Sequence, residues 1–367
     1  MEYIFDDVLE IKNGKNQKAV ENPEGQYPIY GSGGIMGYAN DYICEADTVI
    51  IGRKGSINNP IFVAEPFWNV DTAFGLSARR EILLPQYLFY FCRKYDFEKL
   101  NKTVTIPSLT KSDLLKIKID LPSKEEQQNV VNKLTKIEKV IDFRRKELSA
   151  LDDLIKARFV ELFGDPLSNS LGLETKPMTE VCEIIDGDRG KNYPTADEFT
   201  DEGYCLFLNA KNVTASGFNF DTCMFVSKEK DEVLRKGKLS RGDVVLTTRG
   251  TLGNLAFYTD DIPFEHVRIN SGMVILRMKH EVVNEVYFIE QFKMQLADIK
   301  EKIASGSAQP QLPISTMNKI QILIPDIEIQ KQFAEFVHQV DKSKVVVQKA
   351  LSETQMLFDS LMQKYFG

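Results

Sequence analysis

Apolar side chains recur at alternating steps of three and four residues through the middle of the chain, from Leu134 to Leu162. The residues between them are mostly Lys, Glu, Asp, Gln and Asn, although Arg144 and Arg158 also fall on the repeating positions. This heptad pattern predicts a long helix that packs against a partner along one narrow stripe. The apolar positions of the stripe, called seam 1 below, are Leu134, Ile137, Ile141, Leu148, Leu151, Ile155 and Leu162.

Both ends of this helix are marked in the sequence. Pro122 ends an extended run, Ser123 can cap the first turn, and the acidic pair Glu125–Glu126 suits the positive end of a helix. Gly164 is a typical residue for terminating a helix. At about 1.5 Å per residue, a helix over residues 122–164 would be about 60 Å long.

The partner helix is predicted within the same chain, because a shift of 203 residues aligns this helix with the C-terminal segment 325–367. The shift also matches prolines, a Leu-Ser pair and a final Phe-Gly that the heptad rule does not require, which indicates an internal repeat. We expect the helices to pair antiparallel, since the second must lead back towards the first globular region. The apolar positions of the second stripe, seam 2, are Val337, Val340, Val347, Leu351, Phe358 and Leu361.

The segments outside the helices repeat one another as well. Glu180–Asn192 resembles Asp7–Asn16, and Gly242–Gly253 resembles Ala46–Asn58 with a turn one residue shorter. The sequence therefore predicts an α+β fold of two similar globules, each a small mixed sheet with helices, on an antiparallel coiled coil with approximate two-fold symmetry. The predicted regions are a first globule (1–121), a central long helix (122–164), a second globule (165–324) and a C-terminal long helix (325–367).

Local patterns predict the elements of the first globule, because β-branched runs favour strands and glycine-containing clusters favour turns. The expected elements are a short helix running into a strand over Phe5–Ile11, a strand entering a glycine-rich loop over Tyr27–Tyr38, a strand–turn–strand over Ala46–Val63, a strand over Trp68–Leu76 and a helix over Pro85–Asn101. In the second globule, Glu285–Ala304 is expected to form the equivalent of that last helix.

Composition limits the class of protein. With 367 residues, 43% of them apolar, the chain can bury substantial cores in two or three domains. It has no apolar run long enough to span a membrane, and its N-terminal residues lack the features of a signal peptide. The five cysteines are scattered without metal-binding spacing, as expected for reduced thiols in a cytoplasmic protein.

The sequence contains no recognisable catalytic constellation. The three histidines are widely separated, and single histidines are more often structural than metal-binding. The GSGGIMG segment lacks the spacing of a nucleotide-binding glycine loop, and NNPIF only superficially resembles the motif of amino methyltransferases. We therefore expect no catalysis, no metal site and no cofactor in this chain.

Polar turns occur in duplicate at equivalent places in the two globules. Arginine and lysine can pair with guanine, asparagine can pair with adenine, and serine and threonine can bind phosphates. Each residue taken alone can equally be a solvated turn residue, and only the recurrence favours DNA contact. The candidate DNA-binding residues are Tyr30, Ser32, Arg53, Lys54, Ser56, Asn58 and Asn59 in the first globule, and Arg189, Lys191, Asn192, Lys211, Asn212, Arg249, Thr251 and Asn254 in the second.

The net charge of −7 argues weakly against nucleic-acid binding, which usually requires a basic surface. The argument loses force if basic residues gather on one face or if partner subunits supply more of them.

Several longer segments are distinctive. They are LPSKEEQQNVVNKL and IPDIEIQKQFAEFV at the starts of the long helices, RFVELFGDP after the first, GSAQPQLPIST before the second, and YPIYGSGGIMGY and GDVVLTTRGTLGN within the globules. Through these segments, and over almost its whole length, the chain resembles the DNA specificity (S) subunits of type I restriction–modification systems.

The resemblance implies two target-recognition domains that each read one half of a bipartite site in double-stranded DNA, held apart by the helical pair. It also implies docking with two methyltransferase subunits and with ATP-dependent restriction subunits. S-adenosylmethionine, ATP and Mg²⁺ would then belong to those partners.

Two alternatives remain open from the sequence. One is a specificity subunit of a related system that serves a methyltransferase alone. The other is a coiled-coil scaffold with paired protein-binding globules, which the acidic charge favours slightly and the duplicated basic turns disfavour.

Overall fold

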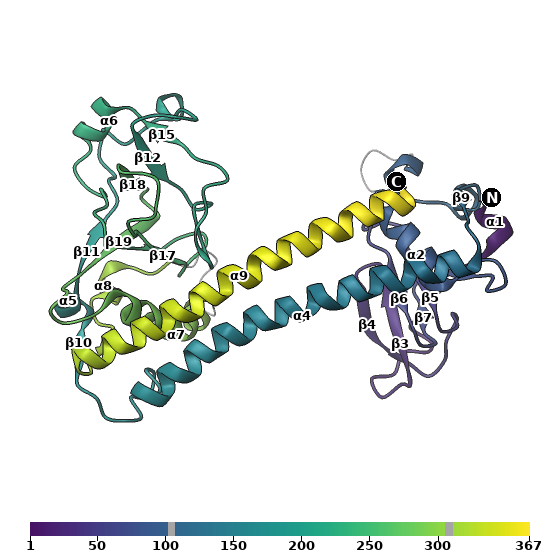
Figure 1. The fold of residues 1–367 in the computed structure, drawn as a ribbon, viewed down its shortest axis with the longest axis horizontal. Coiled ribbons are helices and arrows are strands. Elements are labelled where there is room, and N and C mark those ends of the chain that lie inside the picture. Colours follow the sequence, from purple (N-terminus) through teal and green to yellow (C-terminus); the bar gives the residue numbers. More distant parts are fainter. Residues whose placement is uncertain (102–106, 305–310) are drawn as a thin grey trace. The chain divides into compact units, whose positions relative to one another are not determined.

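The computed structural model describes residues 1–101, 107–304 and 311–367, which form two compact units. Unit 1 comprises Met1–Glu147 and Val347–Gly367, and unit 2 comprises Leu148–Val346. Part of the GSAQPQLPIST segment lies outside the described residues. Each unit therefore combines one globular region with a portion of both long helices, α4 (Lys124–Phe163) and α9 (Ile327–Phe366) (Figure 1).

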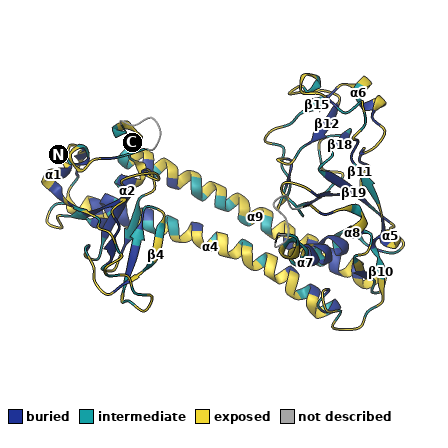
Figure 2. Ribbon diagram, turned by 180° about the vertical axis from the view of Figure 1, so that it is seen from behind, coloured by how far each residue is buried: buried dark blue, intermediate teal, exposed yellow. Residues whose placement is uncertain are grey.

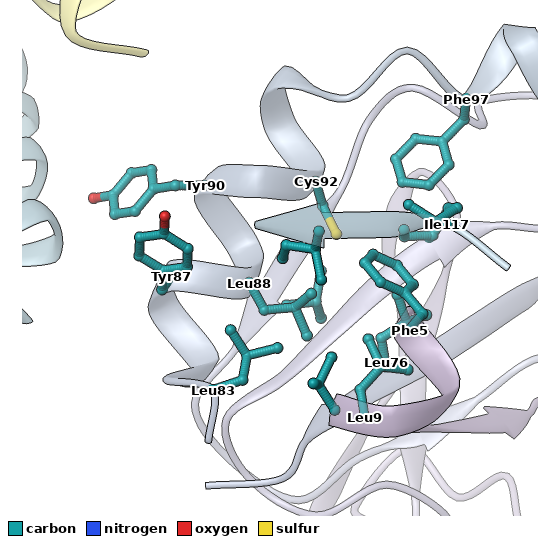
Figure 3. Close-up of a cluster of buried hydrophobic side chains, with 14 of the residues drawn as sticks. Phe5, Leu9, Leu76, Leu83, Tyr87, Leu88, Tyr90, Cys92, Phe97 and Ile117 are labelled. Carbon is teal, nitrogen blue, oxygen red and sulfur yellow. The ribbon is translucent and has the colours of Figure 1, made fainter. Parts of the chain in front are cut away.

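Unit 1 is built on a four-stranded antiparallel sheet in the order β2-β8-β5-β6. Helix α2 (Pro85–Lys94) packs on one face, where Val49 and Leu76 join the main core, whereas Ile50 on the other face joins a smaller cluster around Phe67. Figure 3 shows Leu88 and Cys92 on one side of α2 and Tyr87 and Tyr90 on the other, where they pack on Phe366 and Phe358 of α9 as part of the same core. The strands are β2 (Leu9–Asn13), β8 (Ala73–Ala78), β5 (Thr48–Gly52) and β6 (Ile61–Val63).

Two smaller sheets complete the globular part of unit 1. In the order β4-β3-β7, β3 is antiparallel to β4 and parallel to β7, and the third sheet pairs β1 with β9. The strands are β1 (Glu2–Ile4), β3 (Tyr27–Gly31), β4 (Gly34–Ala39), β7 (Trp68–Asn69) and β9 (Lys118–Asp120). The short helices are α1 (Phe5–Val8), the 3₁₀ turn η1 (Phe97–Leu100) and α3 (Lys111–Leu114).

Unit 2 repeats this topology with the sheets β11-β19-β16-β17, β15-β12-β18 and β10-β20. It adds the β13-β14 hairpin, a 3₁₀ turn and α6 (Lys228–Val233). The strands are β10 (Thr175–Pro177), β11 (Cys182–Asp186), β12 (Cys205–Leu208), β13 (Val213–Thr214), β14 (Gly217–Phe218), β15 (Phe225–Val226), β16 (Val244–Thr247), β17 (Leu255–Phe257), β18 (Val267–Ile269), β19 (Met273–Met278) and β20 (Gln321–Leu323). The 3₁₀ turn is η2 (Ala196–Glu198), and the other helices are α5 (Met178–Val181), α7 (Glu285–Ala304) and α8 (Ile314–Met317).

Three elements of the first globule differ from the sequence prediction. The helix from Pro85 ends at Lys94, because Tyr95 is extended and Asp96 caps the separate turn η1. The single strand expected over Trp68–Leu76 is two strands in different sheets, β7 and β8, joined by a turn closed by Ala73 N–H to Val70 O. The glycine-rich loop after Tyr27 is a tight hairpin turn between β3 and β4.

The long helices run antiparallel to each other within unit 1. The Arg144 guanidinium of α4 donates hydrogen bonds to the Ala350 carbonyl and the Thr354 hydroxyl of α9. Nearer the start of α4, Leu134 shares the main core with Phe358 of α9. Positions later in α9 therefore meet positions earlier in α4.

The same antiparallel arrangement holds within unit 2. The Lys344 ammonium lies 2.6 Å from a carboxylate oxygen of Asp152, and the Phe159 ring packs 5.5 Å from that of Phe333. Each residue of seams 1 and 2 is buried or half-buried, whereas most residues between them are exposed (Figure 2).

A buried glutamine near the start of each long helix fastens it to the globular part of its unit. Gln127 accepts a hydrogen bond from the Leu84 N–H at 2.9 Å and donates to the carbonyls of Ile82 and Pro122 at 2.9 and 3.1 Å. Gln330 repeats this arrangement, accepting from the Asn284 N–H at 2.9 Å and donating to Val282 and Pro325 at 3.4 and 2.9 Å. Both side chains are 0% exposed, so no water can replace these bonds.

We predict that Gln127→Ala and Gln330→Ala each destabilise their own unit by about 2–3 kcal/mol, because buried peptide groups lose their partners. Hydrogen exchange should accelerate at the Leu84 amide in the first variant and at the Asn284 amide in the second. The neighbouring exposed Gln128→Ala is the matched control. Equal exchange in the control and in both variants would contradict the role assigned to the glutamines.

Unit 2 also contains a buried ion cluster. Asp231, which is 2% exposed, meets the Arg268 guanidinium and the Lys238 ammonium, each at 2.5 Å. Arg268 also donates to the Lys236 and Leu234 carbonyls at 2.8 and 3.0 Å. Burial alone would raise the pKa of Asp231, but hydrogen bonds from Lys238 and Arg268 outweigh burial and lower this pKa below its ordinary value.

We predict that Asp231→Asn lowers the stability of unit 2 at neutral pH by about 3–5 kcal/mol, because a buried guanidinium is left without its counter-charge. Since the pKa is lowered in the folded state, the wild-type advantage is full above the unfolded carboxylate pKa of about 3.9 and disappears as the pH falls through the folded value. Melting curves from pH 7 to pH 2 would measure this. The exposed Asp201→Asn is the control, and a pH-independent difference between wild type and Asp231→Asn would refute the linkage.

Candidate nucleic-acid interface

The turn after β5 presents the basic residues of unit 1. The Arg53 N–H donates to the Thr72 carbonyl at 2.7 Å, and the Arg53 carbonyl accepts from the Leu109 N–H at 2.9 Å. Gly55 has a φ of 78°, a conformation that favours glycine. The exposed Arg53 and Lys54 side chains therefore project from a backbone that is fixed on both sides.

The turn after β16 is the equivalent in unit 2. The Arg249 N–H donates to the Gly272 carbonyl at 3.2 Å, and the Leu312 N–H donates to the Thr248 carbonyl at 3.1 Å. Gly250 has a φ of 71°, matching Gly55. Arg249 and Thr251 are exposed on this turn.

A second loop in each unit is held beside the first. In unit 2, the Arg189 guanidinium donates to the Ser271 carbonyl at 3.2 Å, next to Gly272, to which Arg249 is bonded. In unit 1, the Lys15 N–H donates to the Asn69 carbonyl at 2.8 Å, close in sequence to Thr72, the partner of Arg53. The fold therefore brings basic residues from separate loops onto one edge of each unit.

The β3-β4 hairpin lies beside the Arg53 turn in unit 1. A Cβ atom at Gly52 would stand 3.0 Å from the Ser32 Cβ, which places Ser32 against the start of the turn. Tyr30, in β3, packs its ring edge-on against Phe67 at 5.4 Å, and burial raises its pKa. At the hairpin tip, Ile35 and Met36 are exposed.

Four of the five predicted asparagines, Asn58, Asn192, Asn212 and Asn254, have hydrogen-bond partners within the fold. Asn58 accepts from the Phe97 N–H and donates to Asp96, and Asn254 donates to the Val213 carbonyl at 3.0 Å. Asn212 is 0% exposed and donates to the carbonyls of Asn219 and Thr222. These amides position the turns, and the fully buried Asn212 is out of reach of a ligand.

The remaining candidates lie on the same loops or next to them. Ser56 and Asn59 are exposed on the β5-β6 turn, and Lys211 is exposed beside Asn212. Lys191 is exposed after Arg189, whereas the half-buried Asn192 faces α6 and donates to the Val233 carbonyl at 3.3 Å.

Two basic residues were missed by the sequence analysis. Lys15 follows Gly14 in the loop after β2, and the duplicated glycine-containing segment could have indicated it. Lys300, on α7, covers Gly253 in the Arg249 turn so closely that a Cβ atom there would clash. Because this contact joins residues far apart in the sequence, no local pattern signals it.

Acidic residues near the interface are held by internal bonds. The Asp188 carboxylate accepts from the Gly190 and Arg235 N–H groups at 2.8 Å each, and the bond from Gly190 in particular keeps its pKa below the ordinary value. Asp186 pairs with Arg189 at 3.0 Å. The Arg189 turn is therefore ordered by its own carboxylates, and part of the local negative charge is neutralised.

The described ranges 1–101, 107–304 and 311–367 offer neither a metal-ligand cluster nor a membrane-spanning helix. No group of three or more His, Cys, Asp or Glu side chains there could hold a metal ion. No described helix is long and apolar enough to cross a membrane.

Comparison with known proteins gives a consistent result. Residues 2–152 and 171–354 match the family model of the type I restriction modification DNA specificity domain. The type I restriction enzyme MjaVIII specificity subunit of Methanocaldococcus jannaschii is 25% identical over 385 residues, covering 95% of this chain and 88% of the relative. The MjaIX specificity subunit of the same organism is 21% identical over 335 residues, covering 86% and 74%.

Solved structures share the fold. The S subunit of a type I restriction–modification system from M. genitalium has a TM-score of 0.63 at 19% identity, covering 100% of this chain and 96% of that one. A chain from a study of complex assembly and conformational transition of the type I system has a TM-score of 0.58 at 17% identity, covering 100% and 97%. Since the family model matches most of both repeats, the protein belongs to the family of type I restriction–modification DNA specificity subunits.

Proposed function

We propose that each unit reads one half of a bipartite DNA target through the turns after β5 and β16, with the neighbouring loops at Lys15 and Arg189 gripping phosphates. The chain is a specificity subunit, the non-catalytic component of a restriction–modification complex. The regions 1–121 and 165–324 would be the two target-recognition domains. The observation that carries this proposal is the duplicated basic turn, Arg53–Lys54 in unit 1 and Arg249 in unit 2, held by equivalent backbone bonds from Leu109 to Arg53 and from Leu312 to Thr248.

The geometry suits base recognition. A guanidinium can pair bidentately with guanine only if its backbone is held in place, and both turns have glycines at positive φ and hydrogen bonds to two other segments. Lysine side chains beside them supply mobile positive charge for phosphates. Arg53 and Arg249 are therefore assigned to base edges, and Lys15, Lys54 and Lys300 to the DNA backbone.

The net charge of −7 is compatible with this assignment. Interactions between exposed charges are screened beyond about 10 Å at ordinary salt, so the local charge of the turns decides contact with DNA. Partner subunits would contribute further positive charge. We assign the exposed faces of α4 and α9 to docking two methyltransferase subunits, and the restriction subunits would join that assembly.

We predict that Arg249→Ala and Lys54→Ala weaken binding of the assembled complex to its DNA target, Arg249→Ala by about tenfold or more because a base contact is lost. Lys54→Ala should weaken binding to all DNA sequences by a similar factor, and it should reduce the slope of log Kd against log salt concentration by about one. Binding would be measured by titrating labelled DNA at several salt concentrations.

Lys94→Ala and Lys319→Ala are the matched controls, since both residues are exposed and lie outside the proposed turns. Near-wild-type affinity in Arg249→Ala and Lys54→Ala would refute the assignment of the turns. Equal losses in the controls would indicate a general charge effect instead.

A further inference from the structure

A pocket of about 590 Å³ opens in unit 1 between the start of α4 and the last turn of α9. Tyr87 of α2 and Val130 of α4 contribute apolar surface, and Lys133 and Lys364 stand among its lining residues. This volume lies within the range of sites that bind organic groups. None of the DNA-contact residues proposed above lines it.

Unit 2 has an equivalent region between the start of α9 and the end of α4, which we call its corner, and there aromatic side chains of the chain itself fill the space. The Leu121 N–H donates to the Met1 carbonyl at 2.9 Å in unit 1, and the Ile324 N–H donates to the Glu174 carbonyl at 2.8 Å in unit 2. The Tyr87 and Phe366 ring centroids are 4.9 Å apart, and those of Tyr287 and Phe163 are 4.8 Å apart. The two corners therefore share both backbone pairing and aromatic packing.

The difference lies in two positions related by the 203-residue repeat. Val130 in unit 1 corresponds to Phe333, whose ring packs 5.5 Å from Phe159 and 5.6 Å from Phe163. Lys133 corresponds to Phe336, whose ring lies 6.5 Å from that of Phe333. Unit 1 thus lacks two aromatic rings that its counterpart supplies internally, and the pocket lies where they are missing.

The equivalent tyrosines of the two corners also differ in their hydrogen bonding, since only the one in unit 2 has partners within the described residues. In unit 2, the Tyr287 hydroxyl donates to Gln291 at 2.8 Å and is 3.1 Å from the Leu323 carbonyl oxygen. Among the described residues of unit 1, none bonds to the Tyr87 hydroxyl. Burial raises the pKa of Tyr87 to about 12, so the phenol stays protonated and can donate.

The lysines that line the pocket favour a ligand that carries an acidic group. Within the described part of the chain, neither Lys133 nor Lys364 has a carboxylate partner. Glu126 also lines the pocket, but its carboxylate is engaged by the N–H and hydroxyl of Ser123, each at 2.9 Å. Asp120 is the other acidic lining residue. The two ammonium groups are therefore available to an incoming carboxylate.

We propose that this pocket receives an aromatic side chain of a methyltransferase subunit, with a neighbouring carboxylate of that subunit meeting Lys133 and Lys364. The inference rests on the proposed function, in which such a subunit docks on α4 and α9. Aromatic residues that enter preformed pockets are the usual anchors of protein interfaces, and unit 2 shows that aromatic rings fit this corner. Since unit 2 fills its own corner, this anchor is specific to unit 1.

The decisive variant is Val130→Phe, which copies Phe333 and closes the pocket from within. We expect its melting temperature to be equal to or above that of the wild type, and its affinity for the purified methyltransferase subunit to fall at least about tenfold. The double charge reversal Lys133→Glu with Lys364→Glu should also weaken assembly. Lys94→Glu with Lys99→Glu, exposed in unit 1 but outside both long helices and the pocket lining, is the matched control.

A photoreactive benzoylphenylalanine at Asn129, which lines the pocket, provides a readout that does not depend on the stability of Val130→Phe. The cross-linked peptide should contain an aromatic residue of the methyltransferase subunit with Asp or Glu beside it. Cross-links to a peptide without an aromatic residue, or unchanged assembly of folded Val130→Phe and of the charge reversal, would overturn the proposal. Failure of the wild-type chain to bind the methyltransferase subunit at all would instead refute the docking part of the proposed function.

Discussion

The constraint on which the structure depends is that neither long helix can bury its apolar stripe alone. A single amphipathic helix gains most of its stability from packing rather than from intrinsic propensity. In unit 1 the stripe of α4 is covered by α2 and by the end of α9, so Phe358 and Met362 complete a core whose other members precede residue 142. In unit 2 the end of α4 supplies Phe159 to a core that Phe333 completes. Each unit therefore needs segments about 200 residues apart in sequence.

This dependence links the proposed DNA contacts to the helices through a short hydrogen-bonded path. The Arg53 carbonyl accepts from Leu109, and the chain then passes through α3 and β9 directly into α4. Close to the start of that helix, Gln127 holds the N-terminal end of α2. The corresponding path in unit 2 runs from Thr248 through Leu312, α8 and β20 to α9, where Gln330 holds α7. The turn and the long helix are thus joined in each unit by a backbone hydrogen bond and a short stretch of chain.

The sequence predicted those features that depend on local periodicity and on repetition. Heptad spacing located both long helices, and the repeat predicted the duplicated topology and the paired turns. The sequence prediction was wrong where tertiary contacts decide the conformation. The helix from Pro85 ends before Tyr95, and Phe97 beyond it lies in the core. Asn212, which was predicted to contact DNA, is instead buried and donates hydrogen bonds to the carbonyls of Asn219 and Thr222. Lys300 was not predicted for the same reason, because its contact with Gly253 joins residues that are far apart in the sequence.

The repeat also separates what the fold requires from what recognition requires. The four-stranded sheets and the buried glutamines are alike in the two units, whereas the three-stranded sheets differ in chemistry. At equivalent places in these sheets, Trp68 of unit 1 donates its indole N–H to the Lys15 carbonyl, and Arg268 of unit 2 closes an ion cluster with Asp231. These two positions therefore differ in the sheets that support the loops assigned to DNA. Two half-sites of different sequence would require such a difference, because the frame must be constant for spacing while the reading edges differ.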